Sequence, residues 1–520
     1  MNFVGWTYDI AREQAPREGE LRAMLHRSAA AGYNALGLYL EHRFAYPSAP
    51  WAAGPGCLTP DVVRRLLREG PNVLTADTGV AHAPDTADTA VAQVRIIPFL
   101  NTLGHMEGFI RSEGGQWLAE GRAVFGGEQM CATRPECAAF VRDLIADVID
   151  AFDDEWVHLG GDETMQLGQC PACAARVAQI GKGGLYGQHF GPLCRFVLER
   201  GRRPCVWGDM LLHHPEAIDA IPRETVIFDW HYFSRPRDST QLFRARGFDV
   251  VCCPSVQTYN AGWCFLSESL RNIDEHAEDA RAAGALGVLV TTWEFSFFTQ
   301  YLTTLPLIYA AGRRLARGAD WAAAIAAEGG PGYARAAELV GDRIPAVAPF
   351  LKPGTWRQLR DRFIIRQDPF QLWGDWRAEA GGPAGDEILR LCDEAEAHLP
   401  ADSPLRFAVE LHRVAVKWAR LAEQAYQSYA AGRLADCVSK LERGPQLLNQ
   451  LRPGLARAAA AGGSTADVRR LDLLIRRIEH ASERIRELAE GAPHRPAFQT
   501  LTHDAYVSGD QAAWRTAAYQ

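Results

Sequence analysis

The chain has 520 residues, a formal net charge of −8 from 63 acidic and 55 basic residues, and a hydrophobic share of 47%. This composition is typical of a globular protein, and the length allows a barrel of about 250 residues together with a second domain. The acidic balance gives no basic surface for nucleic acid. No run of about 20 apolar residues occurs, so no membrane partner is expected either.

The first residues of the chain and its cysteines suggest the cellular compartment in which the protein is found. Residues 1–9 lack the basic and apolar regions of a signal peptide, so we expect a cytoplasmic protein. Of the 12 cysteines, Cys205, Cys252 and Cys253 fall within apolar runs, where a reduced cysteine behaves as a small buried hydrophobe. We therefore expect free thiols rather than disulfides.

Eight short apolar runs recur along the first 310 or so residues, separated by helical or turn-rich sequence. They cover residues 3–10, 35–41, 94–101, 156–161, 203–208, 225–230, 249–254 and 287–292. Nearly continuous apolar runs are typical of parallel strands buried on both faces. Helical patterns at 20–31 and 137–152 lie between them, and the alternation predicts a (β/α)₈ TIM barrel over residues 1–312. The segment 69–92 has little helical period and is expected to be a loop.

Polar and aromatic residues follow most of these runs, at the end where barrel enzymes build their active sites. In chain order they are Asp9, Arg12, Glu41, His42, Asn101, His105, Asp162, Glu163, Trp207, Asp209, Asp229, Trp230, Tyr259, Trp293 and Glu294. The most informative run is Trp156-Val-His-Leu-Gly-Gly-Asp-Glu163, in which two adjacent carboxylates follow a strand and two glycines. Any one of these residues could be a helix cap or a core residue, but packing alone does not explain the whole series.

From about residue 313 the pattern becomes helical, which predicts a C-terminal helical domain over 313–520. One apolar face contains Leu411, Val414, Trp418, Leu421 and Ala425, and a second contains Val468, Leu471, Leu474, Ile478, Ala481, Ile485 and Leu488. A capping box at 464–467 precedes the second face. The domain could support the site, form a homodimer interface or only stabilise the barrel. Trp373 and Trp376 are expected to pack in a core or between domains rather than on substrate.

These residues resemble the family 20 glycoside hydrolases, the β-N-acetylhexosaminidases, over roughly residues 1–312. The run 158–163 looks like the central motif of that family. Residues 9–12 are similar to its first-strand motif, and 98–105 to its third-strand segment, which usually carries aspartate where Asn101 stands.

The resemblance implies an exo-acting enzyme that hydrolyses terminal β-linked GlcNAc or GalNAc with retention and without a cofactor. Glu163 would be the general acid, and Asp162 would orient the 2-acetamido group of the substrate, whose own oxygen attacks. Arg12 and Glu294 would hold sugar hydroxyls, and Tyr259 would bind the acetamido oxygen. The remaining substrate-binding residues expected are Glu41, His105, Trp207, Asp209, Trp230 and Trp293.

Two other interpretations stay open. A glycosidase with a separate protein nucleophile would use Glu41, Asp209 or Glu294. A sugar-binding barrel without activity is the other, although the presence of both Asp162 and Glu163 argues against it. The sequence decides neither the GlcNAc or GalNAc preference nor the aglycone.

Cysteines near the acid pair raise the question of a metal. Cys170 and Cys173 form a single Cys-x-x-Cys, and Cys131 and Cys137 precede it. Four thiolates would make a zinc site, but one such motif is a weak signal. The cysteine pattern therefore favours reduced thiols and no essential metal.

Overall fold

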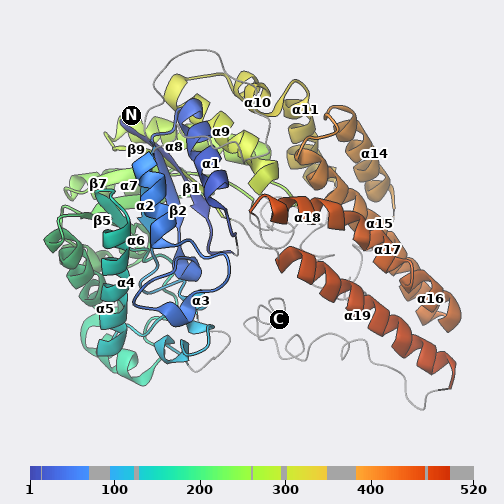
Figure 1. The fold of residues 1–520 in the computed structure, drawn as a ribbon, viewed down its shortest axis with the longest axis horizontal. Helices are drawn as coiled ribbons and strands as arrows, with labels where there is room; N and C mark the ends of the chain where they lie inside the picture. The colour runs from blue at the N-terminus through green and yellow to red at the C-terminus, as the bar shows by residue number, and fades with distance from the viewer. Residues whose placement is uncertain are drawn as a thin grey trace. The chain divides into compact units, whose positions relative to one another are not determined.

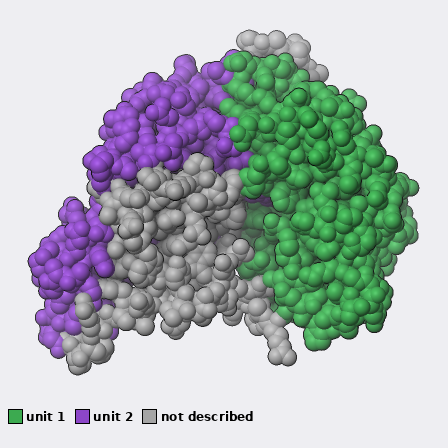
Figure 2. Space-filling view, turned by 180° about the vertical axis from the view of Figure 1, so that it is seen from behind, with its two compact units in different colours: residues 1–256, 270–292, 308–321 green, residues 257–269, 293–307, 322–520 purple. Residues whose placement is uncertain are grey.

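The computed structural model describes residues 1–12, 14–69, 94–121, 128–258, 262–293, 301–347, 382–462 and 466–491. The chain divides into two compact units, which Figure 2 distinguishes by colour. The first comprises Met1–Val256, Leu270–Thr292 and Ile308–Trp321, and the second comprises Gln257–Ser269, Trp293–Leu307 and Ala322–Gln520. The expected loop at 69–92 lies almost entirely outside the described residues.

The first unit contains a closed barrel of eight parallel strands (Figure 1). These are β1 (Phe3–Asp9), β2 (Ala35–Tyr39), β3 (Arg95–Phe99), β4 (Trp156–His158), β5 (Arg203–Trp207), β6 (Val226–Trp230), β7 (Asp249–Cys253) and β9 (Gly287–Thr292). They pair in chain order, and pairing of β1 with β9 closes the ring. The two-residue strand β8 (Ser255–Val256) pairs with β9. The predicted barrel is confirmed, with each strand inside its predicted run.

The barrel strands are buried on both of their faces, as their nearly continuous apolar sequences predict. All seven residues of β1 are buried, as are all six of β9. Inside the barrel, the rings of Phe99 and His158 stack with centroids 4.3 Å apart. Burial lowers the pKa of His158 well below its ordinary value, so this imidazole is neutral. The histidine of the central motif therefore packs in the barrel core, beneath the acid pair.

Helices follow most of the strands. They are α1 (Glu18–Ala31), α2 (Pro60–Glu69), α3 (Glu107–Ile110), α4 (Pro135–Ala151), α5 (Pro171–Glu199), α6 (Asp209–His213), α7 (Arg237–Ala245), α8 (Leu266–Ala282) and α9 (Tyr301–Arg317). The predicted helices at 20–31 and 137–152 correspond to α1 and α4.

The C-terminal region is helical, as predicted. Its helices are α10 (Trp321–Gly329), α11 (Tyr333–Glu338), α12 (Ile344–Val347), α14 (Pro383–Ala397), α15 (Leu405–Ala430), α16 (Leu434–Leu441), α17 (Gly444–Leu448), α18 (Arg452–Ala460) and α19 (Ala466–Ala489). The predicted apolar face of α15 is buried throughout, and so is most of the face on α19. Trp373 and Trp376, together with residues 464 and 465 of the predicted capping box, lie outside the described residues. None of the helices described here is long and apolar enough to cross a membrane.

Candidate active site

The acid pair follows β4 through a tight backbone turn. Gly160 and Gly161 have φ values of 73° and 97°, and Glu163 itself has φ 48°. A Cβ on Gly160 would lie 2.8 Å from the Leu100 carbonyl oxygen, and one on Gly161 would lie 2.6 Å from the Tyr186 hydroxyl. Both positions therefore require glycine. The turn places Asp162 and Glu163 at the carboxyl end of the barrel, as the sequence predicts.

Asp162 is almost completely buried, with 12% of its side chain exposed. Its Oδ2 lies 3.4 Å from His105 Nε2. Its Oδ1 is buried and has no hydrogen-bond partner among the described residues. A buried carboxylate oxygen without a donor is costly, so this atom is suited to accept a hydrogen bond from a ligand.

Glu163 lies beside Asp162 but faces solvent more. Its side chain is 52% exposed, and its Oε2 is 3.3 Å from the same His105 Nε2. Its backbone N–H donates to Asp209 Oδ2 at 3.0 Å. The two acids thus share one imidazole. The apolar surroundings expected of a general acid are not supplied by the part of the chain that the structure describes.

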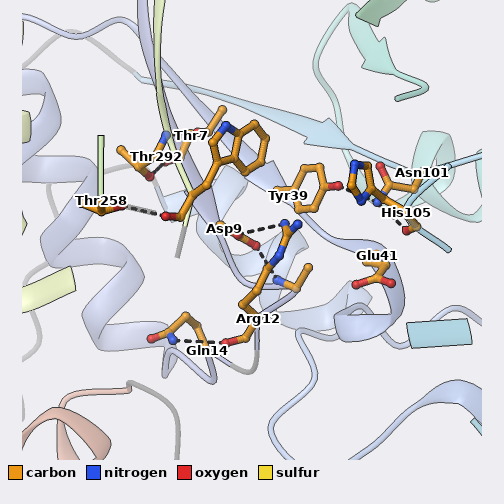
Figure 3. Close-up of polar contacts among 12 residues, drawn as sticks. Thr7, Asp9, Arg12, Gln14, Tyr39, Glu41, Asn101, His105, Thr258 and Thr292 are labelled. Carbon is orange, nitrogen blue, oxygen red and sulfur yellow. Dashed lines mark hydrogen bonds and ion pairs between the residues drawn. The ribbon is translucent and has the colours of Figure 1, made fainter. Parts of the chain in front are cut away.

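His105 occupies a strained position, with φ 51°. Its carbonyl oxygen accepts a hydrogen bond of 2.8 Å from Asn101 Nδ2, which also donates to the Tyr39 hydroxyl at 2.7 Å (Figure 3). Burial would lower the pKa of His105, but Tyr39, Asp162 and Glu107 outweigh it and raise this pKa well above its ordinary value. The imidazole is therefore a cation between carboxylates.

Glu107 is a site residue that the sequence analysis missed. Its Oε1 lies 3.7 Å from His105 Nδ1, on the opposite side of the ring from the acid pair. Although burial opposes ionisation, His105 and Arg12 lower the pKa of Glu107 to about 2. Glu107 supplies a negative charge beside His105, where Asn101 supplies none. Its place two residues beyond His105 was the only signal in the sequence.

Arg12 is held by the ends of β1 and β2. Its Nη1 lies 3.0 Å from Oδ2 of the fully buried Asp9, and its guanidinium lies over the Tyr39 ring at 5.1 Å (Figure 3). Burial would lower the pKa of Arg12, but Asp9 and the other acidic groups raise it well above its ordinary value. With 22% of its side chain exposed, this fixed cation is still accessible to a ligand.

Glu41 is bound into the loop that follows β3. It has φ 40° and is buried, and its Oε1 accepts the Gly108 N–H at 2.5 Å. Its Oε2 lies 3.6 Å from His42 Nδ1. This carboxylate therefore orders the loop that carries His105.

Two of the predicted site tryptophans, Trp207 and Trp230, differ in their surroundings. Trp207 is 1% exposed and packs against His158, with ring centroids 4.4 Å apart. Trp230 is partly exposed, stacks on Tyr232 at 4.9 Å and donates from Nε1 to Asp209 Oδ1 at 3.3 Å. Of these two side chains, only that of Trp230 is accessible to solvent.

Asp209 positions Glu163 and carries a perturbed charge. Burial, together with the negative charge of Asp162, raises the pKa of Asp209 from its ordinary 3.8 to about 7. The native state then keeps a proton that the unfolded chain has released. Between the ordinary pKa of 3.8 and the raised pKa of about 7, the native state binds more protons than the unfolded state. The free energy of unfolding therefore falls as pH rises through this range.

We expect the Asp209→Asn variant to lose this slope, since the amide does not titrate. Urea unfolding at about pH 5 and about pH 8 measures it. Asp219→Asn, which changes an exposed carboxyl on the following turn, serves as the control and should unfold with the wild-type pH dependence. A wild-type slope in Asp209→Asn would show that Asp209 ionises as an ordinary carboxyl.

Three predicted site residues remain, namely Trp293, Tyr259 and Glu294. Trp293 belongs to the second unit, where its carbonyl oxygen accepts a hydrogen bond of 2.7 Å from Thr258 Oγ1. Tyr259 and Glu294 lie outside the described residues, so their predicted roles stay predictions.

Comparison with known families is informative for the barrel. Residues 89–263 match the family model of the glycosyl hydrolase family 20 catalytic domain. This part of the chain is thus similar to the catalytic domain of family 20. The match contains the Asp162–Glu163 motif and the loop with His105, which confirms the resemblance inferred from the sequence. Arg12, Trp293 and Glu294 lie outside the family 20 match.

The solved structures to which this chain is similar include a chitobiase and two enzymes that act on N-acetylhexosamines, all at low sequence identity. A chitobiase from Flavobacterium johnsoniae is 13% identical, with a TM-score of 0.50 over 85% of this chain and 74% of that one. A β-N-acetylhexosaminidase from Bacteroides fragilis is 15% identical, with a TM-score of 0.47 over 60% of this chain and 66% of that one. An exo-β-N-acetylglucosaminidase from Vibrio harveyi, in complex with N-acetylglucosamine, is 16% identical, with a TM-score of 0.48 over 63% and 57%.

The similarity to the chitobiase supports a common fold and no more than that. The chain spans just under two thirds of the Bacteroides fragilis protein and 57% of the Vibrio harveyi one. No curated protein sequence matches the chain.

Proposed function

We propose that the chain is an exo-acting β-N-acetylhexosaminidase that hydrolyses terminal β-linked GlcNAc or GalNAc by a retaining, substrate-assisted mechanism. The observation that carries the proposal is the adjacent pair Asp162 and Glu163, in which one oxygen of Asp162 is buried without a partner among the described residues. An acetamido N–H is a donor of the right kind for that oxygen, and similarity to family 20 supports the choice of substrate.

In this mechanism Glu163 protonates the glycosidic oxygen while the acetamido carbonyl oxygen of the substrate attacks the anomeric carbon. The carbon–oxygen bond to the leaving group breaks, and a bicyclic oxazolinium ion forms. Asp162 accepts the acetamido N–H and stabilises the positive charge that develops on the ring. Glu163 then takes a proton from water, which opens the oxazolinium at the anomeric carbon.

His105 would keep the two acids in position during this cycle. Its Nε2 lies within 3.4 Å of an oxygen of each acid, while Glu107 lies at its other nitrogen. The mechanism requires a negative charge on Asp162 opposite the positive intermediate, and His105 is the group that holds Asp162 Oδ2 in place. The side chain of Glu163 is 52% exposed, so solvent can reach it.

Other residues would bind the sugar. We assign hydroxyl binding to Arg12, whose guanidinium is fixed by Asp9, and stacking on the sugar to Trp230. Glu41, Asp209 and Trp207 would shape the pocket. The resemblance to family 20 assigns further substrate binding to Tyr259, Trp293 and Glu294. No step requires a cofactor.

A separate carboxylate nucleophile is the weaker interpretation. Glu41 uses one oxygen to accept the Gly108 N–H, and Asp209 uses both oxygens to accept the N–H groups of Glu163 and Trp230. These hydrogen bonds indicate that Glu41 and Asp209 hold neighbouring groups in position and do not attack a substrate.

A pair of substrates that differ only at carbon 2 tests the proposal. A 2-acetamido aryl glycoside should be hydrolysed, whereas the matching 2-hydroxy glycoside, which lacks the internal nucleophile, should be almost inert. Proton NMR should show the β-anomer as the first product, because two inversions give net retention. Comparable rates on both substrates, or an initial α-anomer, would contradict the mechanism. Parallel assays with GlcNAc and GalNAc glycosides would establish the epimer preference.

A further inference from the structure

Three thiols and a carboxylate gather in a buried cluster formed by the segments that follow β3 and β4. The cluster consists of Glu120, Cys131, Cys170 and Cys173, all of them buried. One possible ligand atom from each residue lies within 4.8 Å of all the others. The motif Cys170-Pro-Ala-Cys173 is evident in the sequence, whereas only the fold brings Glu120 to it. Cys137 is outside the cluster.

The spacing within the cluster fits a small tetrahedral cation. Cys131 Sγ lies 3.6 Å from both Cys170 Sγ and Cys173 Sγ, and Cys173 Sγ lies 3.1 Å from Glu120 Oε2. Zinc–sulfur bonds of about 2.3 Å at tetrahedral angles place sulfurs roughly 3.8 Å apart. A disulfide would instead need about 2.05 Å, and it would leave one of the three thiols unpaired.

The backbone holds these side chains in place. Glu120 Oε1 accepts the N–H groups of Gly168, Gln169 and Cys170 at 3.1, 2.9 and 3.1 Å. The other oxygen, Oε2, therefore points at the thiols. Cys173 N–H donates to Cys170 Sγ at 3.3 Å, which helps to stabilise a thiolate at the start of α5. Hydrogen bonds of this kind orient ligands around bound metals.

We propose that Glu120, Cys131, Cys170 and Cys173 bind one structural zinc ion. Thiolates select zinc over magnesium or calcium, and a buried set of four protein ligands is typical of a structural rather than a catalytic site. Binding would release the thiol protons, so that zinc replaces the hydrogen bond from Cys173 to Glu120. Because zinc has a single oxidation state here, no electron is transferred.

The proposed zinc would join the two loops that carry the acid–imidazole site. Glu120 and Cys131 belong to the segment that follows β3, and Cys170 and Cys173 to the segment that follows β4. The same two segments are also linked by Gln166 N–H, which donates to Gln129 Oε1 at 3.0 Å. Within the first segment, Met130 N–H donates to the Leu103 carbonyl at 2.8 Å. Zinc would thereby fix His105 relative to the acid pair.

Elemental analysis of the full chain tests the site. Protein purified under reducing conditions, then dialysed against zinc and freed of excess, should contain about one zinc per chain. Removal with a chelator should lower the melting temperature by roughly 5 °C or more, and added zinc should restore it. Cobalt in place of zinc should give thiolate-to-cobalt charge-transfer bands in the near ultraviolet.

Two variants with matched burial locate the ion. Cys131→Ala should lose the zinc, whereas Cys137→Ala removes an equally buried thiol outside the cluster and should keep it. Should Cys131→Ala not fold, Glu120→Gln, which keeps the shape of the carboxylate, should weaken zinc binding at least about tenfold. No zinc after reconstitution, undiminished zinc in Cys131→Ala, or a native mass lower by two hydrogens from a disulfide would each overturn the proposal. None of these readouts depends on glycosidase activity.

Discussion

Replacement of Glu163 by glutamine is expected to lower kcat on an unactivated glycoside by at least about 100-fold. Glutamine keeps the size and the half-exposed position of the side chain, so the fold should be unaffected, but it has no acidic proton for the leaving oxygen. The loss should shrink for aryl glycosides whose leaving group departs without protonation. Steady-state kinetics on both substrate types, with melting temperatures, measure this.

The control for this variant is Glu199→Gln, at the exposed end of α5. It removes a carboxylate far along the chain from the acid pair and should leave both kinetic constants unchanged. Wild-type turnover by Glu163→Gln on the unactivated substrate would exclude Glu163 as the general acid.

Replacement of Asp162 by asparagine should lower kcat/KM by about 10²- to 10³-fold, a loss of roughly 3–4 kcal/mol in transition-state stabilisation. Asparagine can still accept a hydrogen bond, but the negative charge opposite the oxazolinium is gone. Binding of an inhibitor that mimics the oxazoline should weaken by a similar factor, because such a molecule resembles the charged intermediate.

Asp150→Asn, an exposed substitution on α4, is the control for charge removal and should behave as wild type. If Asp162→Asn lowers the melting temperature while both kcat/KM and inhibitor affinity stay unchanged, then Asp162 supports His105 structurally and does not act on the substrate.

The sequence by itself determined the barrel, because local patterns specify its parts. Eight continuous apolar runs separated by helical periods leave few alternatives to eight buried parallel strands, and all eight are present. The apolar faces of α15 and α19 follow from their spacing in the same way. The position of Asp162 and Glu163 was also predictable, since a strand that ends in two glycines must turn at the end of the barrel.

Only the tertiary structure decided which side chains meet. Glu107 faces His105 because His105 adopts a left-handed turn, and no periodicity encodes that turn. Glu120 joins the thiols because its backbone partners lie on the loop after β4, 48 to 50 residues away. Such contacts depend on how two loops fold against each other, and loop conformation follows from long-range hydrogen bonds rather than from local sequence pattern.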